Sequence, residues 1–373
     1  MIPFIDLKKQ YSRIEKDVDQ AIKKVLMHGQ YILGPEVAEL EKKLADFAGT
    51  EYCLGCSSGT DALLMAMMAL DFKRGDAVFT TPFTFFATVE MIALTGATPV
   101  FADIDPKTYN IDPARLREAI LKVREEDKLN LKAIVTVDIF GQPADYDEIQ
   151  KIADEFGMPV IEDGAQAMGA LYKGRRVPSL GKIGCTSFFP AKPLGCYGDG
   201  GAVFTDDKEL YDKMFSILVH GRGGDKYDNV CIGLNARLDT IQAAVLLEKF
   251  KIYEEEIELR QKVVAKYRQA LEGLLTLPHV PESNLSVWAQ FCVLSPDYAA
   301  IQDALRKNDI PSARYYPIPM HLLKAMEYLG YKKGDMPEAE KVAGTVFALP
   351  MHAYLDDATI EKIGDVIRSV VRK

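Results

Sequence analysis

Short apolar runs alternate with amphipathic helical patterns over residues 10–250, and this alternation restricts the chain to few architectures. Apolar runs that lie between amphipathic helices are typical of parallel strands covered by helices on both faces. We therefore predict an α/β fold with a mostly parallel sheet. The expected strands are residues 52–54, 77–80, 99–103, 131–137 and 158–162, and the expected helices are residues 36–48, 57–70, 87–94 and 146–156.

The pattern changes at residue 239, where one long helical stretch rich in charged residues is expected to run to residue 274. A strand at 287–294 and helices at 299–308 and 358–371 are expected after it. The 373 residues exceed one ordinary core, since a domain takes about 150 residues. We therefore predict a large domain of residues 1–250 and a small C-terminal domain of residues 251–373.

Charge and hydropathy exclude some partners. The formal net charge is -9 and Lys and Arg form no long run, so we expect no nucleic-acid partner. No apolar run reaches the length of about 18 residues that a spanning helix needs, so we expect no membrane association. The first residues lack a cationic segment followed by an apolar one, which favours a cytoplasmic protein over a secreted one.

The six cysteines are spread too widely for a disulfide framework. Cys53 and Cys56 form a CxxC motif, but neither a second pair with zinc-ligand spacing nor a thioredoxin-like start accompanies it. We interpret the two cysteines as small apolar residues of a buried strand, and we expect no metal site.

Asp163 follows the apolar run MPVIE, at the expected end of a parallel strand. Open α/β sheets bind ligands at that end of their strands. Asp163 either caps the next helix or is the acidic residue that faces a ring nitrogen of a ligand. Gln166 lies three residues further along the chain.

Lys192 lies between two prolines in the segment SFFPAKPLGCYGDGGAVFT, residues 187–205. It could be a solvated surface lysine. A rigid, partly desolvated loop would instead lower its pKa and free the amine for attack on a carbonyl carbon. Gly198, Gly200 and Gly201 would permit a tight turn and a close approach of the backbone.

Ser57, Ser58, Gly59 and Thr60 open a helix directly after a strand. The free N–H groups and the dipole of such a helix start can bind an anion. Serine and threonine at this position can equally be plain N-caps.

Together these segments resemble the fold-type I pyridoxal-phosphate (PLP) enzymes, and within them the nucleotide-sugar aminotransferase family (DegT/DnrJ/StrS). The resemblance extends from residue 5 nearly to the C-terminus, with the motifs in the family's order. It implies a large domain built on a mostly parallel seven-stranded sheet and a small C-terminal α/β domain. The matching segments are GTDAL (59–63), PFTFFATVE (82–90), GATPVFADID (96–105), IEDGAQAMGA (161–170), residues 187–205, HGR (220–222), LNARLDTIQAA (234–244), YPIPMH (316–321) and LPMH (349–352).

The resemblance implies how the cofactor is held. Lys192 would hold PLP as a Schiff base and shuttle the proton, Asp163 would pair with the pyridinium nitrogen, and Gln166 would bond the ring hydroxyl. Phe85 would stack on the ring, although Phe83, Phe85 and Phe86 could each be core residues. The phosphate contacts would come from Gly59, Thr60 and Ser187, and from Asn235 of the neighbouring subunit in a homodimer with shared active sites.

The resemblance also implies substrate contacts. Arg237 would clamp a carboxylate with its planar guanidinium, or it could be a surface ion-pair partner. Tyr31, Tyr315, Tyr316 and His321 are expected to border the substrate. Gly34 is expected near the same pocket, and no role follows for His220 and His352, although both lie in matching segments.

The implied reaction is a ping-pong transamination in which L-glutamate leaves as 2-oxoglutarate and a keto sugar then receives the amine. The segments FIDLKKQYSRI and HGQYILGPEV are most similar to transaminases acting on a UDP-linked 2-acetamido-3-oxo-hexuronic acid, for surface polysaccharide such as O-antigen. Those enzymes usually have histidine where this chain has Tyr315, a departure that affects the sugar contacts.

Several alternatives stay open. A sugar dehydratase of the same fold would replace the lysine by histidine, so Lys192 argues against it. An aminotransferase for a neutral dTDP- or UDP-linked keto-6-deoxy sugar, or for a cyclitol, keeps the same motifs. A non-catalytic regulator would need neither Lys192, Asp163 nor Gln166.

Overall fold

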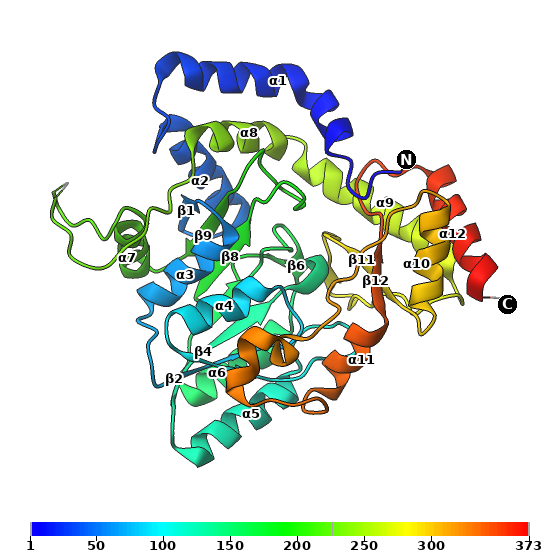
Figure 1. Ribbon diagram of the computed structural model, residues 1–373. Coiled ribbons are helices and arrows are strands. Elements are labelled where there is room, and N and C mark those ends of the chain that lie inside the picture. The colour runs from blue at the N-terminus through cyan, green and yellow to red at the C-terminus, as the bar shows by residue number, and fades with distance from the viewer. Residues whose placement is uncertain (1, 226, 372–373) are drawn as a thin grey trace.

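The computed structural model describes residues 2–225 and 227–371 and contains the predicted seven-stranded sheet (Figure 1). The strand order is β1-β9-β8-β5-β4-β2-β3, and only β9 runs antiparallel to its two neighbours. The α/β fold class is therefore confirmed. The strands are β1 (Tyr52–Cys56), β2 (Asp76–Thr80), β3 (Thr98–Phe101), β4 (Asn130–Val137), β5 (Val160–Asp163), β8 (Ile183–Ser187) and β9 (Gly201–Thr205).

Helices cover both faces of this sheet, because its central strands are apolar on both sides. Helices α2 (Pro35–Ala48), α5 (Pro113–Glu126), α6 (Tyr146–Phe156) and α8 (Thr240–Phe250) pack in one apolar cluster. Helices α3 (Gly59–Ala69), α4 (Phe86–Leu94) and α7 (Lys208–Leu218) pack in the other. The long α1 (Leu7–His28) lies across α8 at the top of the molecule (Figure 1).

Cys53 and Cys56 are buried, unpaired residues of β1, which confirms their interpretation as core residues of a strand. Burial raises the pKa of the Cys53 thiol well above its ordinary value, so the thiolate that redox or metal chemistry requires is disfavoured.

The single helix predicted for residues 239–274 is wrong. Helix α8 ends at Phe250, and α9 (Tyr253–Leu271) begins after a break at Lys251 and Ile252. The reason lies in tertiary structure: Tyr253 is almost fully buried, and its hydroxyl donates to the carbonyl oxygen of Met168. This contact fixes the start of α9 against the turn that follows β5.

The C-terminal part pairs β11 (Phe291–Leu294) with β12 (Val346–Leu349) and packs them against α9, α10 (Tyr298–Lys307) and α12 (Asp357–Val371). It lies beside the large sheet on the right of Figure 1. The division into domains at residue 250 stays a prediction. The remaining elements are β6 (Leu171–Tyr172), β7 (Arg175–Arg176) and β10 (Asn284–Leu285), which form a small sheet, helix α11 (Pro337–Thr345), and the short 3-10 helices η1 (Ile139–Gly141), η2 (Met320–Leu322) and η3 (Lys324–Leu329).

The predicted strand at 287–294 is shorter, because its first part bonds to the short 3-10 helix η1 instead of to β12. The N–H groups of Val287 and Ala289 donate to the carbonyl oxygens of Gly141 and Phe140, at 3.0 and 3.1 Å. A Cβ on Gly141 would lie 2.8 Å from the nitrogen of Trp288, so this close approach requires glycine.

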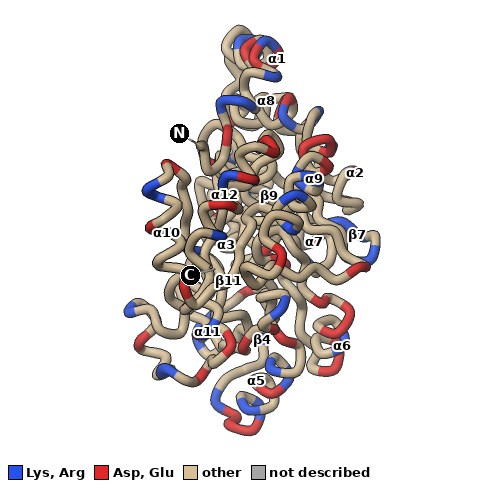
Figure 2. Tube along the Cα trace, turned by 90° about the vertical axis from the view of Figure 1, so that its right-hand side faces the viewer, with Lys and Arg blue, Asp and Glu red and all other residues tan. Residues whose placement is uncertain are grey.

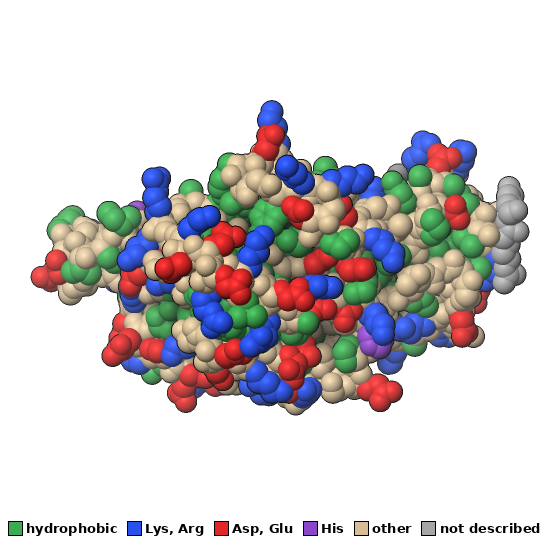
Figure 3. All heavy atoms as spheres, turned by 90° about the horizontal axis from the view of Figure 1, so that it is seen from below, with side chains coloured by type: hydrophobic (Ala, Val, Ile, Leu, Met, Phe, Trp, Pro, Cys, Tyr) green, Lys and Arg blue, Asp and Glu red, His purple; other side chains and the backbone are tan. Residues whose placement is uncertain are grey.

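Charged residues of both signs are interspersed along the chain in Figure 2, and their side chains are interspersed over the face drawn in Figure 3. Within the described ranges, no helix combines the length and the apolar character needed to cross a bilayer.

Candidate active site

The turn that carries Lys192 connects β8 to β9 and is held by its own backbone. The N–H of Lys192 donates to the carbonyl oxygen of Phe189, and that of Cys196 to Phe188, both at 2.8 Å. A Cβ on Gly195 would lie 2.6 Å from the carbonyl oxygens of Phe189 and Pro190. The close backbone approach in this turn is thus at Gly195, which was not predicted, whereas a Cβ on Gly198 or Gly200 would meet side-chain atoms at 3.0 and 3.1 Å.

The amine of Lys192 lies half-buried in a cavity beside Asp163. Burial lowers the pKa of Lys192 to about 8, and the negative charge of Asp163 opposes this effect. An amine with this pKa is partly neutral near neutral pH and can act as a nucleophile or a base.

Asp163 ends β5, as predicted, and its carboxyl group is bound from two sides. The hydroxyl of Thr88 donates to Oδ2 at 2.7 Å, and the N–H of Ala165 donates to Oδ1 at 3.2 Å. Burial raises the pKa of Asp163, whereas these two hydrogen bonds and the charge of Lys192 act in the opposite direction. On the side away from Lys192, the carboxyl group therefore has hydrogen-bond donors but no ion-pair partner among the described residues.

Gln166 connects three segments that are distant in the sequence. Its Oε1 accepts from the N–H of Phe140 at 2.7 Å, and its Nε2 donates to the hydroxyl of Tyr316 at 2.9 Å. The Phe85 ring lies 6.3 Å from the Tyr316 ring and is 57% exposed, whereas Phe83 is fully buried. Among the candidate phenylalanines, Phe85 is thus the one available to a ligand in the cavity.

The start of α3 lies close to Ser187. Ser58 is the N-cap, and its hydroxyl accepts from the N–H of Asp61 at 3.0 Å. A Cβ on Gly59 would lie 2.6 Å from the Cβ of Ser187, and a Cβ on Gly201 would lie 2.5 Å from the carbonyl oxygen of Ser58. The two glycines therefore let the helix start, β8 and β9 approach closely, as a cradle for a small anion requires.

These elements enclose one cavity of about 360 Å³. Nine of the predicted site residues line it: Gly59, Thr60, Phe85, Asp163, Gln166, Ser187, Lys192, Tyr315 and Tyr316. The sequence analysis missed Phe4, Ile5, Thr84, Phe189 and Gln290, which also line it, and Thr88, which bonds Asp163. Thr88 is one of two threonines in the otherwise mostly apolar segment PFTFFATVE, and this polar position was the sequence feature that could have indicated it.

Four predicted residues do not line this cavity. Tyr31, Asn235 and Arg237 lie near one another, because residues 32 and 239 form a backbone bridge and Tyr31 accepts from the N–H of Thr240. Tyr31 and Asn235 are exposed, and Nε of Arg237 is buried without a hydrogen-bond partner among the described residues.

His321, the fourth, is 1% exposed and lies 3.1 Å from Glu340 through its Nε2. Its ring packs against Phe101 and Tyr331, so it faces the interior of the C-terminal part. His321 therefore lies apart from the cavity wall, between β3 and the C-terminal part, and its contact with the substrate stays a prediction.

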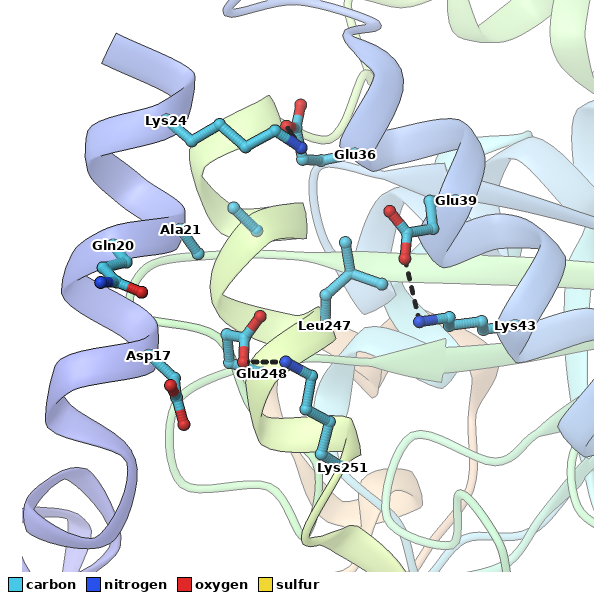
Figure 4. Close-up of a pocket in the computed structure, with 11 residues that line it drawn as sticks. Asp17, Gln20, Ala21, Lys24, Glu36, Glu39, Lys43, Leu247, Glu248 and Lys251 are labelled. Atoms are coloured by element: carbon cyan, nitrogen blue, oxygen red, sulfur yellow. Dashed lines mark hydrogen bonds and ion pairs between the residues drawn. The ribbon is translucent and has the colours of Figure 1, made fainter. Parts of the chain in front are cut away.

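A second cavity, of about 270 Å³, lies between α1, α2 and α8 (Figure 4). Its lysines are neutralised within the chain: Lys24 lies 3.1 Å from Glu36, Lys43 lies 2.9 Å from Glu39, and Lys251 is paired with Glu248. Among the described residues, each lysine that lines this cavity is therefore paired with a glutamate, which leaves no unpaired positive charge for an anion.

Comparisons with known proteins agree with this choice. The model of the DegT/DnrJ/EryC1/StrS aminotransferase family matches residues 12–368. The UDP-2-acetamido-2-deoxy-3-oxo-D-glucuronate aminotransferase of Pseudomonas aeruginosa is 49% identical over 97% of this chain and 98% of its own. A pleiotropic regulatory protein of Geobacillus stearothermophilus is 40% identical over 98% of this chain and 99% of its own.

Two solved structures have the same fold. A DegT DnrJ EryC1 StrS aminotransferase from Brucella abortus superposes with a TM-score of 0.97 at 46% identity, over 100% of both chains. NtdA from Bacillus subtilis, with bound cofactor PMP, gives a TM-score of 0.91 at 28% identity, over 100% of this chain and 85% of its own.

Proposed function

The chain belongs to the DegT/DnrJ/EryC1/StrS aminotransferase family, and on that premise we propose that it uses PLP to aminate a nucleotide-linked keto sugar. The observation that carries this proposal is the Lys192 amine, which shares one cavity with the buried carboxyl group of Asp163. An amine that attacks an aldehyde and a carboxylate that accepts the N–H of a protonated ring nitrogen are the two groups that PLP chemistry requires.

The cavity residues fit this cofactor. Asp163 is a buried carboxyl group that forms no ion pair within 4.0 Å among the described residues, although the charge of Lys192 acts on it, and a protonated ring nitrogen would supply a partner. The start of α3 at Gly59 and Thr60, together with the Ser187 hydroxyl, suits a phosphate group. Phe85 would cover one ring face. When bound, PLP supplies an electron sink for the pair that remains when a substrate carbon loses its proton.

The chain's own residues would do the remaining work. Lys192 would hold the cofactor covalently at rest and, once displaced, would take the Cα proton of the amino donor through its Nζ. A pKa of about 8 suits this exchange near neutral pH. Asp163 would keep the ring nitrogen protonated, while Thr88 fixes the carboxylate by its 2.7 Å hydrogen bond.

We propose L-glutamate as the donor and UDP-2-acetamido-2-deoxy-3-oxo-glucuronate as the acceptor, in the synthesis of a surface polysaccharide. The support for this acceptor is the activity for which the 49% identical relative from Pseudomonas aeruginosa is named. A neutral dTDP- or UDP-linked keto-6-deoxy sugar is the alternative, since Tyr315 lines the cavity at a position where histidine is usual.

We further propose a homodimer in which each subunit completes its partner's site. Tyr31, Asn235 and Arg237 lie outside their own chain's cavity, and Asn235 is exposed. The neighbouring segment carries the exposed apolar residues Val230 and Ile232, at 65% and 85% exposure. Large exposed apolar side chains favour a protein interface.

The test is amination by the purified, PLP-loaded protein. L-glutamate is supplied with UDP-2-acetamido-2-deoxy-3-oxo-glucuronate or with a neutral dTDP-3-oxo-6-deoxy sugar, and the products are identified by mass. Lys192→Ala is expected to lower the rate by about 10²–10⁴-fold, because the proton acceptor is lost. The exposed Lys122→Ala is the matched control.

Several outcomes would contradict the proposal. A Lys192→Ala variant with a rate near wild type refutes the assignment of the lysine. Preference for the neutral sugar refutes the uronic-acid acceptor. A wild-type protein that aminates neither sugar but binds PLP supports the regulatory alternative, to which the 40% identical relative points.

A further inference from the structure

The turn of residues 139–143, which follows β4, sets the orientation of the Gln166 amide. The N–H of Phe140 donates to Oε1 of Gln166 at 2.7 Å, and Nε2 of Gln166 donates to the hydroxyl of Tyr316 at 2.9 Å. Because a backbone N–H only donates, it fixes which end of the amide is the oxygen. Tyr316 lines the Lys192 cavity, whereas Phe140 lies outside its wall. The Nε2 end therefore lies on the cavity side, and the hydroxyl of Tyr316 takes one of its two N–H groups.

The backbone of Phe140 has a conformation that a bulky residue rarely adopts. Its φ and ψ are 60° and 12°, in the left-handed region. Residues keep such a conformation only where the surrounding contacts impose it. The direction of the Phe140 N–H, and with it the orientation of Gln166, thus depends on what holds the turn.

Asn110 holds this turn at both of its ends. Its Oδ1 accepts from the N–H of Ile139 at 3.2 Å, and its Nδ2 donates to the carbonyl oxygens of Gln142 and Pro143 at 3.1 and 3.0 Å. Asn110 is 3% exposed, so water cannot easily replace these bonds. The three contacts lie on either side of Phe140 in the sequence and use both the oxygen and the nitrogen of the amide.

We propose that Asn110 is a positioning residue for Gln166: it holds the turn so that the Phe140 N–H keeps the Nε2 end of Gln166 toward the ring hydroxyl of PLP. This inference rests on the proposed function, and it deepens it by naming the residue that fixes the amide. Without that hold, the amide can rotate by half a turn and place Oε1, an acceptor, against the negatively charged ring oxygen. Asn110 does not line the cavity, so it acts through Gln166.

The first test measures the pH at which the absorbance of the Lys192-bound cofactor changes, as the Schiff base loses its proton. An N–H donated to the ring oxygen favours the deprotonated form, because that oxygen then carries more negative charge. Asn110→Ala is expected to raise this pH midpoint by about one unit. In a Gln166→Met background, Asn110→Ala should leave the midpoint unchanged, because no amide remains to be oriented.

The second test does not depend on the cofactor. Hydrogen exchange of residues 138–144, measured by mass spectrometry on the full chain, reports the N–H groups of Ile139 and Phe140. Asn110→Ala is expected to speed their exchange by about 10-fold, because the turn loses the bonds that hold it. Asn110→Asp keeps the oxygen that accepts from Ile139 and loses both donors. It should change both readouts in the same direction as Asn110→Ala.

Thr205→Val is the matched control. Thr205 is also buried and also bonds the backbone of two segments, since its hydroxyl donates to the carbonyl oxygen of Lys182 and accepts from the N–H of Asp207. It lies at the end of β9 away from the lysine turn. The control variant should lower the thermal midpoint of unfolding without changing the cofactor's pH midpoint or the exchange of residues 138–144.

Four results would overturn the inference. Asn110→Ala leaves the cofactor's pH midpoint unchanged in wild type, it shifts the midpoint equally in both backgrounds, it leaves the exchange unchanged, or neither Asn110 variant folds, in which case Asn110 serves the stability of the fold. Failure of the proposed function gives a different pattern. Wild type then shows no cofactor absorbance and aminates no keto sugar, while Asn110→Ala still speeds the exchange of the turn.

Discussion

Replacing Thr88 by valine removes one hydroxyl from beneath the site and leaves the shape of the side chain nearly intact. Thr88 is 1% exposed, and its Oγ1 lies 2.7 Å from Oδ2 of Asp163, which is 5% exposed. No water can easily replace the lost donor at so buried a position. The variant therefore tests whether the charge of Asp163 matters for catalysis.

The expected size of the effect follows from the type of bond. A hydrogen bond to a charged group is worth about 1.5–3 kcal/mol. Its loss disfavours the carboxylate by that amount, so the pKa of Asp163, which burial already raises, rises further. When a smaller fraction of Asp163 is ionised, a smaller fraction of the cofactor's ring nitrogen is protonated. The ring is then a weaker electron sink. We expect kcat to fall by about 10–100-fold, since 1.4 kcal/mol corresponds to a factor of ten.

The assay is kcat for L-glutamate and keto sugar between pH 6 and 9, with PLP in excess. The loss should be largest at low pH, where the weakened carboxylate takes up a proton first. Thr80→Val is the control, because Thr80 is also fully buried but donates to the carbonyl oxygen of Val135. If Thr88→Val and Thr80→Val have the same rate and the same pH profile, Thr88 does not act through Asp163.

Two further predictions concern the cofactor cradle and stability. Gly59→Ala should weaken PLP binding in equilibrium dialysis, because its Cβ would lie 2.6 Å from that of Ser187; unchanged binding would contradict the cradle. His352 is 4% exposed, and burial lowers its pKa to about 4. Below pH 6.5, His352 therefore binds a proton in the unfolded chain but stays neutral in the folded chain. The free energy of unfolding falls as the pH falls from 6.5 towards 4. His352→Gln should reduce the difference in unfolding free energy between pH 7 and pH 5 by about 2 kcal/mol in urea titrations; an equal difference in both proteins would refute this.

The alternation of strands and helices could be predicted because burial on both faces leaves a strong pattern in the sequence. The break at Lys251 and Ile252 could not, since the local sequence favours helix throughout. Its position depends on Tyr253, which is buried against a residue 85 positions away. Contacts of this kind leave no periodic signal.

The site divides in the same way. Lys192, Asp163 and Gln166 carry motifs, and the structure brings them into one cavity. Gln290 also lines the cavity, but it lies in no motif. Its place in the cavity wall depends on backbone bonds of its neighbours to Phe140 and Gly141, which lie far away in the sequence. In the proposed homodimer, Arg237 and its exposed neighbours contact the partner subunit. Their role therefore depends on the assembly and not on a pattern within one chain.

The place of β9 in the sheet has a consequence for how the protein is made. Strand β1 is complete early in synthesis, but its partner in the sheet is β9, which follows about 150 residues later. Residue 205 must therefore be synthesised before β1 can pair, and until then neither edge of β1 has a partner strand in the sheet. Strand β9 also pairs with β8, and the turn between them carries Lys192. Pairing of β9 thus completes the sheet at β1 and closes the lysine turn in one event, so a chain that has not reached residue 205 has neither the complete sheet nor the closed turn.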